Sequence, residues 1–472
     1  MPRIGVSLSG IERTLLNRLN EANSAAALHS LRLATGRKVN RPADDPARFV
    51  ELSGLRSRQN TVTATLANVS AASEVVATTQ LALDNIRTQL NTIRTLALAD
   101  EDQQLTAEQR AANQAAIDAA IDEIEKLAGT QSAAGKSLLD GSSDFDISGR
   151  NASQISDVTV HRLAPGATTT IDVEVTTAAT QAVLTYTGTS GQVTNEAQFT
   201  LSGDRGSATI DVSGGENLTD VRDRINLESH HTGVVASVSG DDLTLTSIEF
   251  GTDATTGVAV LSGTFTVTGG TNGVATGTDG VATINGQSVT GRGNRFTVSD
   301  NSLTFTLETA AGFTGTADTV TISAGGSLSF ALSPELAHSS TLGLTSVAPH
   351  RLGGLSGTLD QLRTGEAAGD LGTNAPLAVR IADEALADLT RLEGTVDGFA
   401  DAAIASSNTL LTELEEELQT TIDVLDKVDE NEEALLRDKA LELVDNSVAG
   451  LAVLANTRSS VLEIIRQIAG LS

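Results

Sequence analysis

Two short stretches of this 472-residue chain contain residue types that could support chemistry. The first, GTQSAAGKS at residues 129–137, is close to a phosphate-binding loop, in which backbone amides and a lysine surround a phosphate. Five residues separate Gly129 from Gly135 where that loop has four, and a helical pattern precedes it where a strand is required. The spacing therefore argues against a nucleotide site.

The second stretch is the adjacent pair His230 and His231. Neighbouring residues of a helix or strand do not converge on one metal ion, and the chain has no cysteine to complete a zinc site. Carboxylates are plentiful, but no run of them suggests a buried acid/base pair. We therefore predict no catalytic, cofactor or metal site, and no enzyme.

The composition excludes further classes of function. Aromatic residues make up 2% of the chain, which argues against a ligand cleft or a base-stacking surface. The formal net charge of −29 argues against nucleic acid as a partner. No apolar run is long enough to span a bilayer, and the start, MPRIGVSLSGIERTLLNRLN, lacks the apolar stretch of a secretory signal. We expect no membrane insertion and no cleaved signal peptide.

Two arms with helical periodicity enclose a centre rich in Thr, Ser, Gly and Val. Each arm repeats apolar residues every seven positions, which is typical of a coiled-coil seam. The N-terminal seam comprises Leu55, Val62, Val69, Val76, Leu83, Leu90 and Ala97, with Ala72, Ile86 and Ile93 at the partner positions. The C-terminal seam comprises Ile404, Leu411, Leu418 and Leu425, with Leu414 and Val428. Because one such helix alone exposes an apolar stripe, we expect the two arms to bury each other's stripes or to pack in a bundle.

The extreme ends of the chain are also amphipathic but carry few bulky residues. The N-terminal stripe is Leu8, Ile11, Leu15, Leu19, Ala22 and Ala26, and the C-terminal stripe is Val444, Val448, Leu451, Ala455, Leu462 and Ile465. A terminus of this kind often orders only when a partner covers it. The partner could be the other end, a neighbouring copy, or both. Charge favours such pairing, because residues 1–60 are net basic and the C-terminal arm is strongly acidic.

An elbow, ATGRKVNRPADDP at residues 34–46, separates the first two helices. Gly36 is expected to end the first helix, and Pro42 and Pro46 restrict the backbone that follows. Asp44 or Asp45 is expected to cap the next helix.

The centre alternates apolar and polar residues in short runs, which predicts antiparallel β-structure. Residues 198–215 and 232–251 each read as a hairpin, and residues 216–226 as a short helix with Leu218, Val221 and Ile225 on one face. An Asn285-Gly286 turn marks a second β block. The predicted fold class is α+β and multidomain, with long terminal helices paired as a coiled coil or bundle and inserted antiparallel β-rich domains.

Several of these motifs resemble bacterial flagellin and its relatives, the hook–filament junction proteins. The resemblance rests on SLRLATGRKVNRPADDPA (30–47), ATTQLALDNIRTQLNTIRTLALA (77–99), GTQSAAGKSLLDGS (129–142) and SVAGLAVLANTRSSVLEIIRQIAGL (447–471). The central SATIDVSGGENLTDVRDRIN and GVVASVSGDDLTLTS are similar to an insertion motif of flagellin outer domains.

The resemblance implies six segments. They are an inner-tube helix (1–45), an N-terminal helical part (46–144), two β-rich outer domains (145–262 and 263–345), a C-terminal helical part (346–430) and a second inner-tube helix (431–472). It also implies an assembly interface that includes Leu8, Ile11, Leu15, Leu19, Arg37, Lys38, Arg41, Asp44, Asp45, Val448, Leu451, Leu454, Leu462 and Ile465.

The function implied by the resemblance is that of a self-assembling subunit of the bacterial flagellar filament, for swimming motility. Such a subunit is exported unfolded through the flagellar type III apparatus and is extracellular. Its implied partners are further copies of itself, hook-associated and cap proteins, an export chaperone and the export gate, and no cofactor is implied.

Two alternatives remain open. NRPADDP is closer to the hook–filament junction proteins, which adapt filament to hook, whereas LLDG and the insertion motif favour flagellin. A glycan-binding adhesin would place function in the Thr/Ser-rich β domains, but it would need an aromatic patch that this composition hardly offers.

The basic cluster of the elbow gives a first testable prediction. Replacing Arg37, Lys38 and Arg41 together by Glu is expected to weaken assembly more than monomer folding, because these side chains would face acidic surface on the other arm or on a neighbour. Filament yield by electron microscopy, beside the thermal unfolding of the monomer, checks this. Normal filament formation would contradict it.

Overall fold

A computed structural model describes residues 10–101, 105–133, 135–164, 167–300, 303–335 and 339–468. The chain divides into two compact units. The terminal unit contains residues 1–66 and 409–472, and the central unit contains residues 67–408. Among the described residues, no helix is both long enough and apolar enough to cross a membrane.

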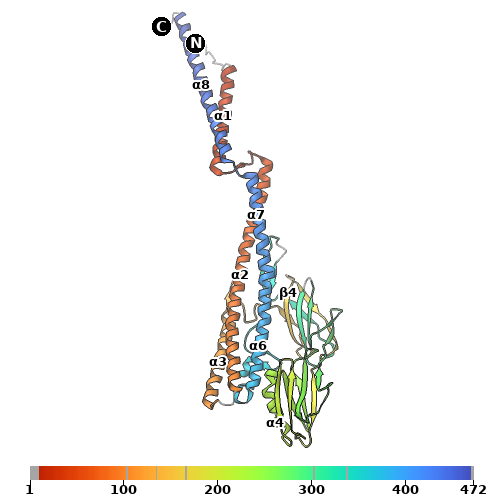
Figure 1. Ribbon diagram of the computed structural model, residues 1–472. Coiled ribbons are helices and arrows are strands. Elements are labelled where there is room, and N and C mark those ends of the chain that lie inside the picture. Colours follow the sequence, from red (N-terminus) through yellow and green to blue (C-terminus); the bar gives the residue numbers. More distant parts are fainter. Residues whose placement is uncertain are drawn as a thin grey trace. The chain divides into compact units, whose positions relative to one another are not determined.

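Most helices come from the two arms (Figure 1). Their bounds are α1 Gly10–Thr35, α2 Pro46–Glu101, α3 Ala107–Thr130, α6 Leu371–Phe399, α7 Ser406–Asp426 and α8 Glu430–Ile468. A π-helical segment, η2 (Ala400–Ala405), connects α6 to α7, and a 3-10 turn, η1 (Leu359–Leu362), precedes α6. Two short helices, α4 (Leu218–Leu227) and α5 (Ser229–Thr232), lie in the β-rich centre.

Most residues of the predicted heptad seams are buried, which confirms the expected pairing of the arms, whereas Leu55, Leu414 and Leu425 are half-buried. In α2, Val62, Val69, Val76, Leu83, Leu90 and Ala97 are all at most 4% exposed. In the central unit, α2 and α6 are further linked by the Arg87–Glu393 ion pair and by Arg94 Nε, 2.6 Å from Asp383 Oδ1. In the terminal unit, Gln59 contacts Gln419 and Thr63 contacts Glu415. The order of these contacts shows that α2 and α7 run antiparallel.

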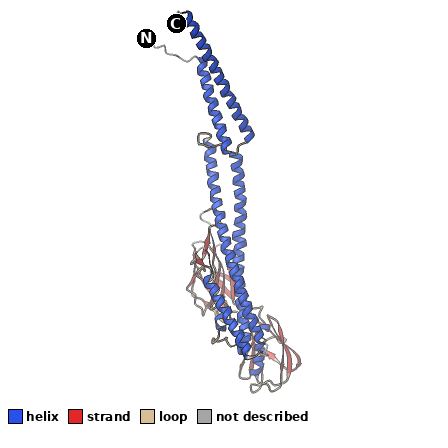
Figure 2. Cartoon of the chain, turned by 90° about the vertical axis from the view of Figure 1, so that its left-hand side faces the viewer, coloured by secondary structure: helices blue, strands red, loops and turns tan. Residues whose placement is uncertain are grey.

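Helix α3 completes the bundle of the central unit. Its start follows from a capping box, in which the Thr106 hydroxyl accepts from Gln109 N and the Gln109 side chain accepts from Thr106 N. Ile117, Ile121 and Ile124 of α3 are fully buried. Figure 2 shows helices forming the long axis of each unit and the strands gathered beside the helices of the central unit.

Helix α4 packs with one face against the first β core of the central unit. Two four-stranded sheets build this core, with strand orders β10-β11-β7-β13 and β14-β12-β8-β9. The bounds are β7 Val183–Thr187, β8 Ala197–Gly203, β9 Ser207–Val212, β10 Val234–Ser239, β11 Asp242–Ser247, β12 Thr255–Gly263, β13 Val267–Thr268 and β14 Val274–Thr276. The predicted face of α4, Leu218, Val221 and Ile225, is fully buried in this core. Phe265 stacks between Tyr186 and Phe199, with ring centroids 4.0 and 4.3 Å away.

The second β core joins strands from both sides of the first in sequence. Its sheets have the orders β16-β15-β6-β19, β17-β18-β4 and β3-β20-β5. The bounds are β3 Asp146–Ser148, β4 Ile155–Leu163, β5 Thr168–Ile171, β6 Val173–Thr177, β15 Val281–Ile284, β16 Gln287–Thr290, β17 Arg295–Ser299, β18 Leu303–Thr309, β19 Gly315–Thr316 and β20 Val320–Ser323. The predicted turn between β15 and β16 has left-handed Asn285 and Gly286, as a type I′ hairpin requires.

Six two- and three-residue strands form separate small ladders. They are β1 Ser132–Ala133 with β2 Lys136–Ser137, β21 Leu328–Phe330 with β22 Ser340–Leu342, and β23 Gly353–Gly354 with β24 Gly357–Thr358.

The two β cores are nested along the chain. Core residues of the first run from Ala182 to Ala275, whereas those of the second lie on both sides of that range. The chain therefore passes between the cores from Val175 to Ala182 and again from Ala275 to Ala282, whereas the two similar β blocks of the sequence suggested one boundary at 262. Thr180 and Thr278 pair at the crossing, with Thr180 N donating to Thr278 O at 2.9 Å.

Two half-buried carboxylates make the stability of the central unit depend on pH. Burial raises the pKa of Asp144 and of Asp388 from an ordinary 3.8 to about 6. Since the folded pKa is raised, the stabilisation is complete below pH 3.8 and is lost as pH rises through about 6. We expect the central unit to be more stable at pH 5 than at pH 7.5, by about 1.4 kcal/mol for each carboxyl, because only about one pH unit of this interval lies below the folded pKa of about 6.

The matched variant is Asp144→Asn combined with Asp388→Asn. Because an amide stays neutral, thermal unfolding of the double variant should be less dependent on pH between 5 and 7.5. An unchanged pH profile in the double variant would contradict the assignment.

Candidate functional site

The elbow of the terminal unit begins where α1 ends. Gly36 has a φ of +68°, a left-handed conformation that terminates the helix as predicted. The following turn is closed by Asp44, whose Oδ2 accepts from the amides of Asn40 and Arg41, each at 2.9 Å. Asp45 Oδ1 accepts from Arg48 N at 3.0 Å and caps α2. The paired aspartates therefore have different roles, one in the turn and one at the helix.

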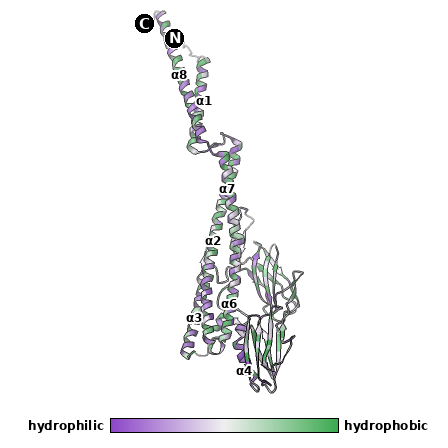
Figure 3. Ribbon diagram, viewed as in Figure 1, coloured by the Kyte–Doolittle hydropathy of each residue, from purple (hydrophilic) through white to green (hydrophobic). Residues whose placement is uncertain are grey.

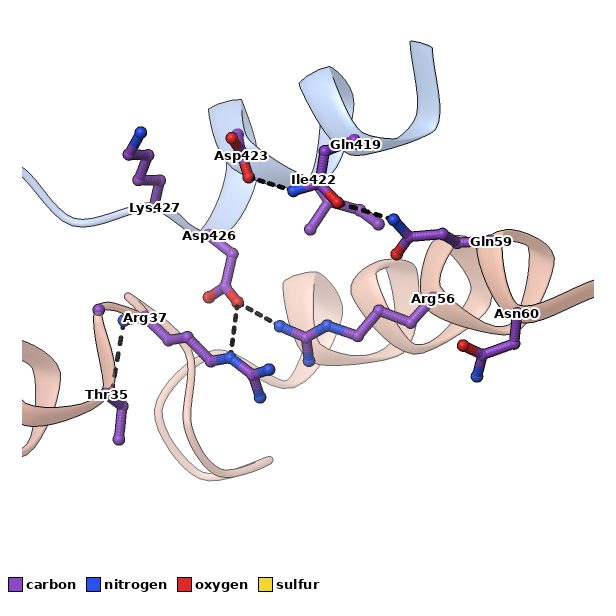
Figure 4. Close-up of a pocket in the computed structure, with 11 residues that line it drawn as sticks. Thr35, Arg37, Arg56, Gln59, Asn60, Gln419, Ile422, Asp423, Asp426 and Lys427 are labelled. Carbon is purple, nitrogen blue, oxygen red and sulfur yellow. Dashed lines mark hydrogen bonds and ion pairs between the residues drawn. The ribbon is translucent and has the colours of Figure 1, made fainter. Parts of the chain in front are cut away.

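A buried carboxylate of α7, Asp426, holds the elbow. Asp426 is 3% exposed, and its Oδ1 accepts from Val39 N at 2.9 Å. Its Oδ2 pairs with the guanidinium of Arg56 and lies 4.0 Å from Arg37 Nε. Its backbone carbonyl accepts from Lys38 N at 2.6 Å. Figure 4 shows Arg37 and Arg56 converging on this carboxylate from two parts of the N-terminal arm.

Backbone pairing and a small apolar cluster support the same joint. Val428 N donates to Gly36 O at 3.1 Å, and Arg37 forms a β-bridge with Lys427. Beneath them Val39, Leu52 and Ile422 are buried together. The N-terminal elbow and the turn between α7 and α8 are therefore one folded structure.

A recess of about 600 Å³ opens beside the joint. Its lining is polar and of mixed charge, and comprises Thr35, Gly36, Arg37, Arg56, Gln59, Asn60, Gln419, Ile422, Asp423, Asp426 and Lys427. The lining contains no histidine, cysteine or serine that could serve as a base or nucleophile. Across the described part of the chain, no three His, Cys, Asp or Glu side chains are grouped to hold a metal. The contacts of Asp426 make this recess part of the joint between the elbow and α7.

The structure distributes the predicted basic residues unevenly. Arg37 contacts Asp426 within the same chain, whereas Lys38 and Arg41 reach the joint only through their backbone amides. Two residues that the sequence did not single out, Asp426 and Arg56, carry the central ion pair. The Arg37 contact also means that a triple substitution with Glu would disturb folding, so Lys38→Glu with Arg41→Glu is the cleaner test of assembly.

Helices α1 and α8 of the terminal unit form an antiparallel hairpin. At one end, Glu433 Oε1 lies 2.6 Å from His29 Nδ1 and 3.5 Å from Arg32 Nη1. At the other end, Arg458 Nη1 lies 3.5 Å from Glu12 Oε1. Between them the buried apolar residues are small: Ala22, Ala26 and Ala440.

Large apolar side chains of this hairpin stay exposed. Figure 3 shows hydrophobic and hydrophilic residues alternating along both helices. The exposed set includes Ile11 at 64%, Val448 at 50%, Val453 at 63% and Leu462 at 55%. Leu15, Leu19, Leu451 and Leu454 are half-buried. Of the remaining predicted interface residues, Leu8 and the side chain of Ile465 lie outside the described residues.

Two segments of the chain match known protein families. Residues 6–144 match the bacterial flagellin N-terminal helical region, and residues 198–249 match the flagellin hook IN motif. The resemblance to bacterial flagellin, drawn from the motifs, is thereby confirmed, as is the assignment of the central insertion motif.

Individual relatives agree with this assignment over part of their length. Flagellin B of Helicobacter pylori is 27% identical over 140 residues, which is 30% of this chain and 27% of that protein. A flagellin of Clostridium tyrobutyricum is 28% identical over 124 residues, 26% of this chain and 32% of that protein. The matched region thus spans about a quarter to a third of the length of these curated relatives.

Solved structures with similarity include the FlgL protein of Xanthomonas campestris. It has 13% identity and a TM-score of 0.28, with coverage of 77% of this chain and 97% of that one. The flagellar cap protein FliD of Escherichia coli has 21% identity and a TM-score of 0.27 in a match that covers 38% of this chain and 98% of that one.

Removing the central carboxylate should loosen the elbow. Asp426→Ala leaves Arg56 and the Val39 amide without their partner, and we expect it to destabilise the terminal unit by roughly 2–4 kcal/mol. Amide hydrogen exchange of Lys38 and Val39 should accelerate in the monomer. The control is Asp423→Ala on the same helix, whose carboxylate accepts only from Gln419 and which should leave both amides protected. Equal exchange in the two variants would disprove the role of Asp426.

Proposed function

We propose that this chain, which carries the flagellin N-terminal region and hook IN motif, is a structural subunit that polymerises into the bacterial flagellar filament. The terminal helices would form the polymer, and the β-rich centre would project from it. The observation that carries the proposal is the α1–α8 hairpin, which buries alanines internally and leaves Ile11, Val448 and Leu462 exposed.

Exposure of this kind is costly in a monomer. Several large apolar side chains on one hairpin form the type of surface that copies of a protein cover in an assembly. The ionic contacts at the two ends of the hairpin hold it closed, so that the apolar residues are presented on a defined scaffold. Polymerisation would remove that surface from water and would stabilise the subunit by mass action.

The remaining features of the proposal follow from the family. The subunit would leave the cell unfolded through the flagellar type III apparatus, with an export chaperone and the export gate as transient partners. In the flagellum it would be extracellular and would contact hook-associated and cap proteins at the ends of the polymer. The family is structural, and a non-enzymatic role is part of this proposal.

A second candidate is a hook–filament junction protein. The elbow sequence NRPADDP favours it, because this form of the motif is closer to the junction proteins. A junction protein would use the same helical ends but would not form long polymers. The two candidates therefore differ in the length of the polymer that the chain forms.

Assembly of the purified chain separates these candidates. The full chain, with a precipitant or short filament seeds, is compared by negative-stain electron microscopy with a variant lacking residues 1–45 and 431–472. Long uniform tubes from the full chain alone are expected. Persistent monomers in the presence of seeds would contradict the filament proposal, and binding to isolated hook ends would then support the junction protein.

A further inference from the structure

An exposed stripe follows the outer side of α2 in the terminal unit. The inner side of the helix buries Leu52 and Val62 and faces α7. On the side away from α7 lie Val50, which is 71% exposed, and the exposed residues Gly54, Arg58 and Thr61. These four residues are separated by three or four positions, so they lie along one side of the helix.

A second stripe follows the outer side of α7. The inner side of this helix buries Leu411, Leu418 and Ile422. The outer stripe consists of Leu410 and Val424, which are 64% and 73% exposed, with the exposed residues Glu413, Glu417 and Thr420 between them. The α2–α7 pair therefore has a different exposed stripe on each flank.

The two stripes are complementary in charge. Arg58 lies in the α2 stripe, and Glu413 and Glu417 lie in the α7 stripe. None of the three makes an ion pair within the part of the chain that the structure describes. Each stripe thus combines an apolar residue that folding leaves exposed with a charge that folding leaves unpaired.

The stripes also match in spacing when two helices run antiparallel. Arg58 follows Val50 by eight residues, or about 12 Å along α2. Glu417 precedes Val424 by seven residues, or about 10.5 Å along α7. A contact between Val50 and Val424 therefore brings Arg58 opposite Glu417, within the reach of an arginine side chain.

We propose that the α2 stripe of one copy docks antiparallel on the α7 stripe of a second copy, with Val50 against Val424 and Arg58 paired with Glu417. This inference rests on the proposed self-assembly and names the faces that carry it. Because the two faces differ, the contact is head-to-tail, and each added copy presents a free face to the next. Such a contact generates an open-ended array rather than a closed dimer.

Charge reversal tests the pairing. Arg58→Glu and Glu417→Arg each place like charges together, and each should raise the critical concentration for assembly roughly threefold to tenfold. The double variant should assemble as the unmodified chain does. An equimolar mixture of the two single variants should also assemble, with the two variants alternating. Each contact then joins Glu at 58 to Arg at 417, or Arg at 58 to Glu at 417. If residues 58 and 417 instead paired within one molecule, mixing the two variants would not restore assembly.

The matched control is Arg222→Glu, which reverses a half-buried arginine of the β-rich centre and should leave assembly unchanged. Circular dichroism of each monomer checks that folding is retained. If both single variants assemble normally, or if the mixture fails while the double variant succeeds, the proposed contact between copies is wrong.

Cysteine cross-linking tests the apolar pair, because the natural chain has no cysteine. Val50→Cys combined with Val424→Cys in one chain should give a ladder of multimers on mild oxidation. A mixture of the two single variants should give dimers only. Dimers from Val50→Cys alone would indicate that like faces meet, and would overturn the head-to-tail arrangement.

Polymerisation of the unmodified chain distinguishes an error in this inference from an error in the proposed function. If it polymerises but the double cysteine variant gives no ladder, the filament proposal stands and the α2–α7 contact is wrong. If it forms no polymer even with seeds, the filament proposal fails, and with it the contact between copies.

Discussion

The terminal unit depends on one buried carboxylate in an otherwise strongly acidic arm. Asp426 accepts from the Val39 amide and pairs with Arg56, so residues close to opposite ends of the chain meet at one group. Burying a charge in this way is costly unless every partner is in place. The contacts of the joint therefore form together or not at all. Asp426, the last residue of α7, also fixes the turn that leads from α1 into α2.

Stability is distributed unequally between the joint and the hairpin beyond it. The joint has an ion pair, backbone pairing and the Val39–Leu52–Ile422 cluster. The α1–α8 hairpin has alanines at its centre and ionic contacts at its ends. Small buried side chains contribute little apolar area, so the hairpin is weakly stabilised on its own.

Local patterns predicted local structure well, because their causes lie within a few residues. The α2 seam, the left-handed Gly36 and the face of α4 all follow from spacing and from backbone preference. The nesting of the two β cores was not predicted. Alternating apolar and polar residues identify a strand, but they do not identify the strand that pairs with it about a hundred residues away. The role of Asp426 was missed for a similar reason. In a sequence with so many carboxylates, nothing local distinguishes Asp426 from those that stay exposed.

The crossing at Thr180 and Thr278 gives the nested β domain both of its connections at a single point. The chain enters and leaves the domain that contains β7 to β14 at this bridge, and the domain also contacts α6, where Arg380 donates a hydrogen bond to the Ser229 hydroxyl. Chain ends this close let a domain be exchanged or lost without altering the path of the rest. Changes in the sequence or size of this inserted domain therefore need not alter the path of the chain through the surrounding core.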